Sequence, residues 1–157
     1  QRGTLFGQQG EQRQKWYRDY DWGIEINPRS SGFRPLDLGL VELGNKSFKV
    51  LGSGPARAVM ECLYLAPAHQ PLLEIYEPME GLNNLRPLSV QKLLESCTSV
   101  KVKRLFLYMA EKAGHDWFSF LNTDKIDLGR GKRMITAGGS LNVKYQITVP
   151  GELVSAK

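Results

Sequence analysis

The sequence predicts a single α+β domain over residues 1–157, with N-terminal strands and a hairpin, central helices and C-terminal antiparallel strands. Three observations predict this fold. Apolar residues alternate with polar ones near both ends of the chain, as in half-buried strands. In the centre they recur at spacings of three and four, as on the buried face of a helix. A chain of 157 residues with 41% hydrophobic residues suits one domain with its own core.

The N-terminal third predicts one strand and one hairpin. Residues 24–26, Ile-Glu-Ile, alternate in polarity and indicate a short half-buried strand. Residues 27–32 have the composition of a loop, because Pro, Ser and Gly favour turns. Two apolar stretches, residues 40–43 and 48–51, flank the polar residues 44–47, which is typical of a hairpin with a four-residue loop.

Two helices are predicted next. Ser53 is expected to cap the first helix, because its hydroxyl can accept a hydrogen bond from a free N–H, and Pro55 suits the first turn. Pro67 ends this helix, and a shorter helix around residues 72–76 is expected to end near Pro78 and Gly81. The apolar stripe of the first helix consists of Ala56, Val59, Met60, Leu63 and Tyr64.

Three more helical segments complete the centre. Ser89 is expected to cap the first of them. The second, over residues 102–113, has the most regular pattern of the chain, with Gly114 as its expected left-handed terminator. A short helix around residues 117–121 follows. The apolar faces of the first two segments are formed by Val90, Leu93, Leu94 and Cys97, and by Val102, Leu105, Phe106, Met109, Ala110 and Ala113.

The chain then returns to strands. Residues 133–136 predict one strand, and Gly138 and Gly139 predict a turn. Residues 141–149 predict a second strand, because Val, Tyr, Ile and Val alternate with polar residues over its last seven positions.

The net charge of +5 is carried by the C-terminal half of the chain. Residues 1–81 contain 9 Lys and Arg against 10 Asp and Glu, whereas residues 82–157 contain 12 against 6. A basic half indicates an acidic partner, either nucleic acid or an acidic protein face. An ordinary solvated surface has the same composition, and the two interpretations stay open.

No constellation of residues predicts catalysis, a metal site or a cofactor, so we expect a protein that is not an enzyme. His69 and His115 accompany no nucleophile motif, and with Cys62 and Cys97 they match no zinc spacing. Residues 129–133, Gly-Arg-Gly-Lys-Arg, lack the upstream glycine of a phosphate-binding loop and the Ser or Thr after its lysine. Two acidic pairs, Asp19 with Asp21 and Asp124 with Asp127, are interpreted as turn and capping residues.

Two cysteines are too few for a disulfide framework, and small buried thiols on helices explain them. No apolar run is long enough to span a membrane, and no signal peptide is evident. We therefore expect a reduced, cytoplasmic chain without a membrane partner.

Aromatic and charged residues are interleaved near the N-terminus. The segment contains Trp16, Tyr17, Tyr20 and Trp22, with Lys15 and Arg18 between them. These rings would suit a stacking surface for nucleic acid. Packing of the rings in the core, with the charges facing water, is the favoured interpretation.

Six stretches, in this order, resemble the AbiEi family of antitoxins. They are residues 15–23, 37–40, 54–61, the pair 85–87 and 99–108, 125–133, and 145–150. The similarity covers roughly residues 5–153. Such proteins usually carry an N-terminal winged helix-turn-helix that binds operator DNA, and are encoded beside a nucleotidyltransferase-like toxin in systems of abortive phage infection.

The resemblance implies that this chain is the second, antitoxin-associated domain, because no helix-turn-helix precedes Gln1. It further implies a cytoplasmic, non-catalytic role in opposing that toxin and in regulating the operon. Operator DNA, bound mainly through the absent N-terminal domain, and the toxin are the partners it implies.

For this domain we predict one exposed basic patch that recognises an acidic partner. Among its members, Arg104 has the best case for a structural role, since it lies in the most regular helix. The predicted patch consists of Lys101, Lys103, Arg104, Arg130, Lys132 and Arg133.

Three other classes of function predict different surfaces. A DNA-binding accessory domain predicts affinity that falls steeply with salt. A protein-interaction or dimerisation domain without a toxin partner predicts an exposed apolar patch. An unrecognised enzyme predicts a carboxylate cluster in a cleft.

Overall fold

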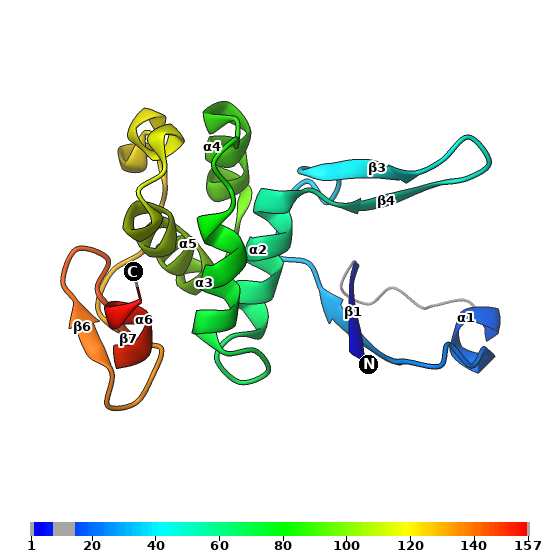
Figure 1. Cartoon of the computed structure of the whole chain (residues 1–157), viewed down its shortest axis with the longest axis horizontal. Helices are drawn as coiled ribbons and strands as arrows, with labels where there is room; N and C mark the ends of the chain where they lie inside the picture. The colour runs from blue at the N-terminus through cyan, green and yellow to red at the C-terminus, as the bar shows by residue number, and fades with distance from the viewer. Residues whose placement is uncertain (1, 8–14, 157) are drawn as a thin grey trace.

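Within residues 2–7 and 15–156, which the computed structural model describes, four helices form the centre. Figure 1 shows the C-terminal strands on one side of these helices and two projecting arms on the other. The helices are α2 (Pro55–Leu65), α3 (Leu72–Glu80), α4 (Pro87–Ser96) and α5 (Val100–Ala113). Their buried faces make one hydrophobic core. Strands precede and follow these helices in the chain, so the predicted α+β class is confirmed.

Helix α5 runs through the middle of this core. The Ser99 hydroxyl accepts a hydrogen bond from the backbone N–H of Val102 at 3.3 Å, and Gly114 ends the helix in the predicted left-handed conformation, with φ 71°. α2 and α3 pack against α5, and the ring of Tyr145 from the C-terminal strands lies 6.4 Å from that of Tyr108. As a result all residues from 102 to 110 are buried, including the positions expected to face solvent.

Proline, not serine, marks the start of two helices. α2 begins at Pro55 after Gly54 and α4 begins at Pro87 after Arg86, in both cases without a side-chain cap. The predictions that Ser53 and Ser89 act as caps are therefore wrong. The Ser53 hydroxyl instead donates a hydrogen bond to Glu61 at 2.5 Å.

The lower arm in Figure 1 is a parallel pair of strands, β1 (Arg2–Gly7) and β2 (Glu25–Ser30), with the short helix α1 (Lys15–Asp19) beside it. β2 includes residues 27–30, which were predicted to be a loop. Pro28 is tolerated in this strand because a two-stranded pair has only edge strands, where a missing N–H costs little.

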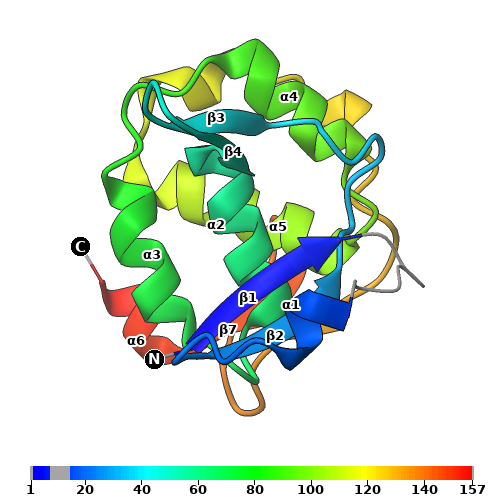
Figure 2. The same cartoon turned by 90° about the vertical axis from the view of Figure 1, so that its right-hand side faces the viewer.

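The upper arm is the predicted hairpin, formed by β3 (Leu40–Gly44) and β4 (Lys49–Ser53) in antiparallel register. Figure 2 looks onto both arms end-on and shows α2 between them. The hairpin contacts the rest of the described chain mainly at its base, where Gly54 N–H donates to the Gly39 carbonyl at 2.8 Å. Every residue from 41 to 51 is exposed.

The C-terminal strands are β5 (Arg133–Met134), β6 (Ser140–Asn142) and β7 (Ile147–Val149), in the order β5-β7-β6. β6 and β7 are antiparallel as predicted, but β5 and β7 are parallel. The predicted single strand over residues 141–149 is also wrong. A turn at residues 143–146 divides it, with Gln146 at φ 51° and the Asn142 side chain accepting from Tyr145 N–H at 2.9 Å.

Short helical turns complete the chain. The 3₁₀ helix η1 (Asp116–Phe120) corresponds to the predicted short helix, and its Trp117 is buried with the indole N–H donating to the Leu82 carbonyl at 2.7 Å. η2 (Thr123–Lys125) and the C-terminal α6 (Gly151–Ser155) were not predicted. None of the described helices combines the length and apolarity that a membrane-spanning segment needs.

Candidate functional site

A basic loop, residues 129–133, lies on the surface, follows η2 in the chain and leads into β5. Its three cationic residues, Arg130, Lys132 and Arg133, are all exposed. The loop reverses direction at two glycines in the left-handed region, Gly129 at φ 62° and Gly131 at φ 76°. These glycines explain the sequence Gly-Arg-Gly-Lys-Arg without a phosphate-binding loop.

The guanidinium of Arg104 donates hydrogen bonds to the backbone carbonyls of this loop. Its Nε donates to the Leu128 carbonyl at 2.7 Å, and its Nη2 donates to the Gly129 carbonyl at 3.2 Å. Its Nη1 donates to the carbonyls of Gly131 and Gln146 at 2.7 and 3.2 Å. A single side chain of α5 therefore fixes the backbone of the basic loop and joins it to the segment before β7.

Local bonds add to the rigidity of the loop. The Asp127 carboxylate accepts from Gly129 N–H at 2.8 Å, and Arg133 N–H donates to the Gln146 carbonyl at 2.8 Å. The turn role predicted for Asp127 is confirmed, as it is for Asp21, whose carboxylate accepts from Gly23 N–H at 2.9 Å. Because hydrogen bonds hold the backbone at several points, the basic side chains extend from a backbone whose conformation is already fixed.

Arg104 also contributes its charge to the loop. Burial lowers the pKa of its guanidinium, and the nearby positive charge of Arg133 lowers it further. The four carbonyl oxygens that accept from Arg104 are uncharged, so they do not neutralise its charge. The buried cation therefore adds to the field of the three exposed ones and favours an anionic partner.

The prediction of one exposed patch of six cations is wrong for its helical members. Arg104 is only 3% exposed and Lys103 only 4% exposed, while Lys101 is partly buried. Lys101 Nζ donates to the carbonyls of Tyr64 and Ala66, at 3.1 and 2.6 Å, at the C-terminal end of α2. These three side chains are buried or partly buried because α5 lies in the centre of the fold, where neighbouring elements and not water cover its polar side.

Titratable side chains elsewhere have structural contacts. His115 is buried with Nε2 2.7 Å from the Met79 carbonyl, and the Cys97 thiol is buried 3.5 Å from the Tyr64 hydroxyl. Burial raises the pKa of the partly buried Cys62 thiol, which disfavours the reactive thiolate. Among the described residues, no group of three or more His, Cys, Asp or Glu side chains could hold a metal ion.

Both arms expose apolar side chains that the sequence patterns did not reveal. The two apolar stretches predicted the hairpin itself, and the structure shows that apolar residues on both of its strands are exposed. The core packing predicted for the N-terminal rings is also wrong for Tyr20 and Trp22, which are 63% and 41% exposed, whereas Tyr17 is partly buried. The Trp16 side chain lies outside the described part. On the hairpin the exposed large apolar residues are Val41, Leu43, Phe48, Val50 and Leu51.

Comparison with known proteins finds one family. The profile of a family described as "Transcriptional regulator, AbiEi antitoxin, Type IV TA system", where TA stands for toxin–antitoxin, matches residues 1–150. No curated protein and no solved structure matches the chain.

Proposed function

The chain belongs to the AbiEi family of antitoxins and transcriptional regulators of type IV toxin–antitoxin systems, and on that premise we propose a non-catalytic role for it. It opposes a nucleotidyltransferase-like toxin and supports regulation of its own operon, in the cytoplasm, as part of a defence against phage. The basic loop over Arg104 contacts the phosphate backbone of operator DNA. A winged helix-turn-helix of the parent protein reads the operator sequence.

The preformed basic loop is the observation that carries this proposal. Arg130, Lys132 and Arg133 are exposed on a backbone fixed by Arg104, so binding an anion requires little ordering of the chain. Contacts to phosphate need only cations and N–H donors and carry no sequence information. The loop therefore adds affinity, whereas the choice of operator belongs to another part of the protein.

The experiment measures binding to the operon's own promoter DNA by fluorescence anisotropy at several salt concentrations. Replacing Arg130, Lys132 and Arg133 together by Ala is expected to weaken binding and to reduce the salt slope by about 1 for each phosphate that the variant no longer neutralises. A control removes the same charge from other exposed positions, through Arg34→Ala, Lys46→Ala and Lys92→Ala. Equal effects of the two triple variants would exclude a specific role of the loop.

Antitoxin action is tested separately by growth rescue, with the neighbouring toxin gene induced in cells that express the complete antitoxin. The triple loop variant is expected to keep rescue if the loop serves DNA binding alone. Loss of rescue with unchanged DNA binding would instead assign the loop to an acidic face of the toxin or of its target.

A second candidate, docking of another protein, is favoured by the hairpin. Leu43, Phe48 and Leu51 are 50%, 59% and 67% exposed on an arm that leaves both of its edges unpaired within the described chain. Exposed apolar patches and open strand edges mark interaction surfaces. Light scattering tests this: replacing these three residues by Ser is expected to abolish any self-association, or the capture of purified toxin, without changing DNA binding.

A further inference from the structure

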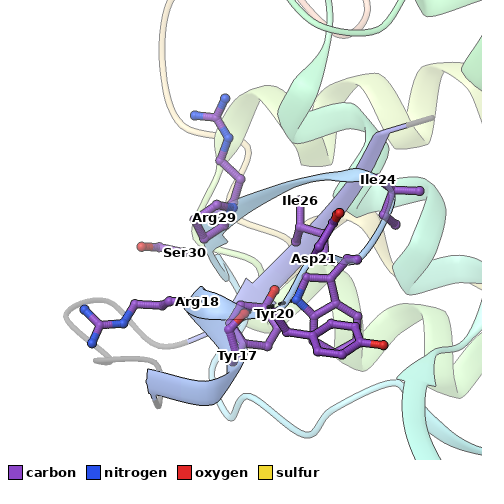
Figure 3. Close-up of a pocket in the computed structure, with 10 residues that line it drawn as sticks. Tyr17, Arg18, Tyr20, Asp21, Ile24, Ile26, Arg29 and Ser30 are labelled. Carbon is purple, nitrogen blue, oxygen red and sulfur yellow. Dashed lines mark hydrogen bonds between the residues drawn. The ribbon is translucent and has the colours of Figure 1, made fainter.

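A second candidate site, which is concave, lies in the lower arm, away from the basic loop. A pocket of about 600 Å³ opens between α1, the turn that follows it and β2. This volume is within the range of small-molecule sites in proteins. Figure 3 shows the side chains around it, with Tyr20 and Ile24 on one side of the view and Arg18, Arg29 and Ser30 on the other.

One side of the pocket is a rigid aromatic cluster. Trp22 lies between two tyrosines, with ring centroids 5.4 Å from Tyr17 and 4.8 Å from Tyr20. The indole N–H of Trp22 donates to the Tyr17 carbonyl at 3.0 Å, which fixes the orientation of its ring. Tyr20 is 63% exposed, and its ring meets that of Trp22 edge-on, so much of its surface is left open to solvent. Such a ring can stack on a planar ligand without first losing side-chain freedom.

The other side of the pocket is cationic. Arg18 comes from α1 and Arg29 from β2, and both are exposed. Arg29 Nη2 lies 3.1 Å from Nε2 of His69, which must accept this hydrogen bond because the guanidinium only donates. The contact turns the Arg29 guanidinium toward His69, and Figure 3 shows it pointing away from Arg18, so Arg29 adds positive charge beside the pocket without meeting Arg18 at one point.

One acidic residue, Asp21, also lines the pocket and limits how an anion can bind. Its Oδ1 accepts from Gly23 N–H, which leaves Oδ2 as an acceptor for a ligand. A phosphate beside this carboxylate would be repelled, whereas the amino and ring N–H groups of a nucleobase would be attracted. The end of the pocket near the rings therefore suits a planar group that donates hydrogen bonds, and the end near the arginines suits an anion.

We propose that this pocket binds a nucleobase with its phosphate, the base stacked on Tyr20 and the phosphate held by Arg18. The ligand is either a free nucleotide or a nucleotide of a single strand, since both present the same chemistry. Duplex DNA does not fit, because its bases are stacked and inaccessible. The site is independent of the basic loop and of the hairpin.

The experiment titrates the chain with AMP, GMP, CMP and UMP by calorimetry, and with a labelled twelve-nucleotide single strand by anisotropy. Tyr20→Ala is expected to weaken binding by about 5- to 150-fold, the loss of one stacked base. Arg18→Ala is expected to weaken it as well, and to reduce its salt dependence. The matched controls, Phe120→Ala and Arg34→Ala, remove an exposed ring and an exposed cation elsewhere and are expected to have no effect.

Each outcome is decisive. Binding of mononucleotides identifies a free nucleotide as the ligand, and binding of the oligonucleotide alone identifies a single strand. Absence of both, or equal binding by Tyr20→Ala and the parent chain, overturns the proposal. A Tyr20→Ala variant that loses only capture of the purified toxin would assign the rings to a protein contact instead. The triple loop variant is expected to keep nucleotide binding while its duplex binding weakens, so failure of one proposal is distinguishable from failure of the other.

Discussion

Arg104 and Gly131 are 27 positions apart in the sequence, yet Nη1 of Arg104 donates a hydrogen bond to the Gly131 carbonyl at 2.7 Å. This bond and its three companions make the central helix the support of the basic loop. The sequence pattern places Arg104 among the polar residues of α5. The structure shows that its charge is used inward, to fix the backbone from which three other cations project.

Arg104→Met is expected to destabilise the chain by about 3 kcal/mol or more, because four partly buried hydrogen bonds from a charged donor are lost. Arg104→Lys should not restore stability, since an ammonium cannot match the planar fork that reaches four acceptors. Urea unfolding checks this, with the exposed Arg130→Met as control, for which we expect a change within about 0.5 kcal/mol. If Arg104→Met and Arg130→Met unfold at the same urea concentration, Arg104 does not organise the loop.

The second prediction concerns the ion pair of Arg57 and Glu61 on α2, whose Nε and Oε1 are 2.8 Å apart and whose side chains are only 4% and 9% exposed. Arg57 also donates to the carbonyls of Leu36 and Leu38, and so ties the segment before the hairpin to the helix. Arg57→Ala is expected to cost about 3–5 kcal/mol, because it leaves Glu61 buried without its partner.

The double variant Arg57→Leu with Glu61→Leu is the informative comparison, measured by urea unfolding beside Arg57→Ala. It removes both charges and keeps apolar volume, so it should be less destabilising than the single substitution. A double variant at least as unstable as Arg57→Ala would show that the bonds to Leu36 and Leu38 matter more than the unpaired carboxylate.

The sequence predicted the elements with regular apolar patterns well, but it predicted poorly which of their surfaces are buried by other parts of the chain. The apolar stripe of α5 and its end at Gly114 follow from local rules that the structure obeys. The burial of Lys103 and Arg104 does not follow from those rules, because it depends on a segment more than twenty residues later folding over the helix. Conversely, the two apolar stretches predicted the hairpin, but no local pattern indicates that a strand lacks a covering layer, as at Phe48.

The candidate site shows the same division. The exposed cations Arg130, Lys132 and Arg133 lie in a glycine-rich turn, which sequence composition predicts to be at the surface. The aromatic pocket was found in the sequence only as a cluster of rings. Its exposure depends on how β2 pairs with β1, a long-range contact that the polarity of residues 27–30 did not indicate.

The third prediction compares three glycines near the C-terminus. A Cβ at Gly139 would lie 2.5 Å from the carbonyl oxygen of Val149, a backbone atom that cannot move without disturbing the β6–β7 pairing. Gly139→Ala is therefore expected to destabilise by about 1–3 kcal/mol. Gly138 has open space but φ 70°, so Gly138→Ala should cost about 1–2 kcal/mol through backbone strain alone. At Gly151 neither applies, and Gly151→Ala should change the midpoint of thermal unfolding little. A Gly139→Ala variant as stable as Gly151→Ala would contradict the register of β6 on β7.

The last prediction is a pH dependence that involves Tyr145, whose hydroxyl donates to Glu111 of α5 at 2.9 Å. Burial raises the pKa of Tyr145 above its ordinary value of about 10, and the hydrogen bond and negative charge of Glu111 raise it further. The folded state therefore holds this proton more tightly than the unfolded state. The stability that results is fully present below about pH 10 and is lost progressively as the pH rises above it.

Tyr145→Phe removes both the hydrogen bond and this titration. At pH 7 the variant should be less stable than the parent chain by about 1 kcal/mol, the usual net value of one such bond. Above pH 10 the parent loses stability that the variant cannot lose, so the difference should shrink and then vanish. Urea unfolding from pH 7 to 11 measures it, with the exposed Tyr20→Phe as control, for which no hydrogen bond to Glu111 is at stake. A difference that stays constant over this range would show that the Tyr145 proton is not coupled to folding.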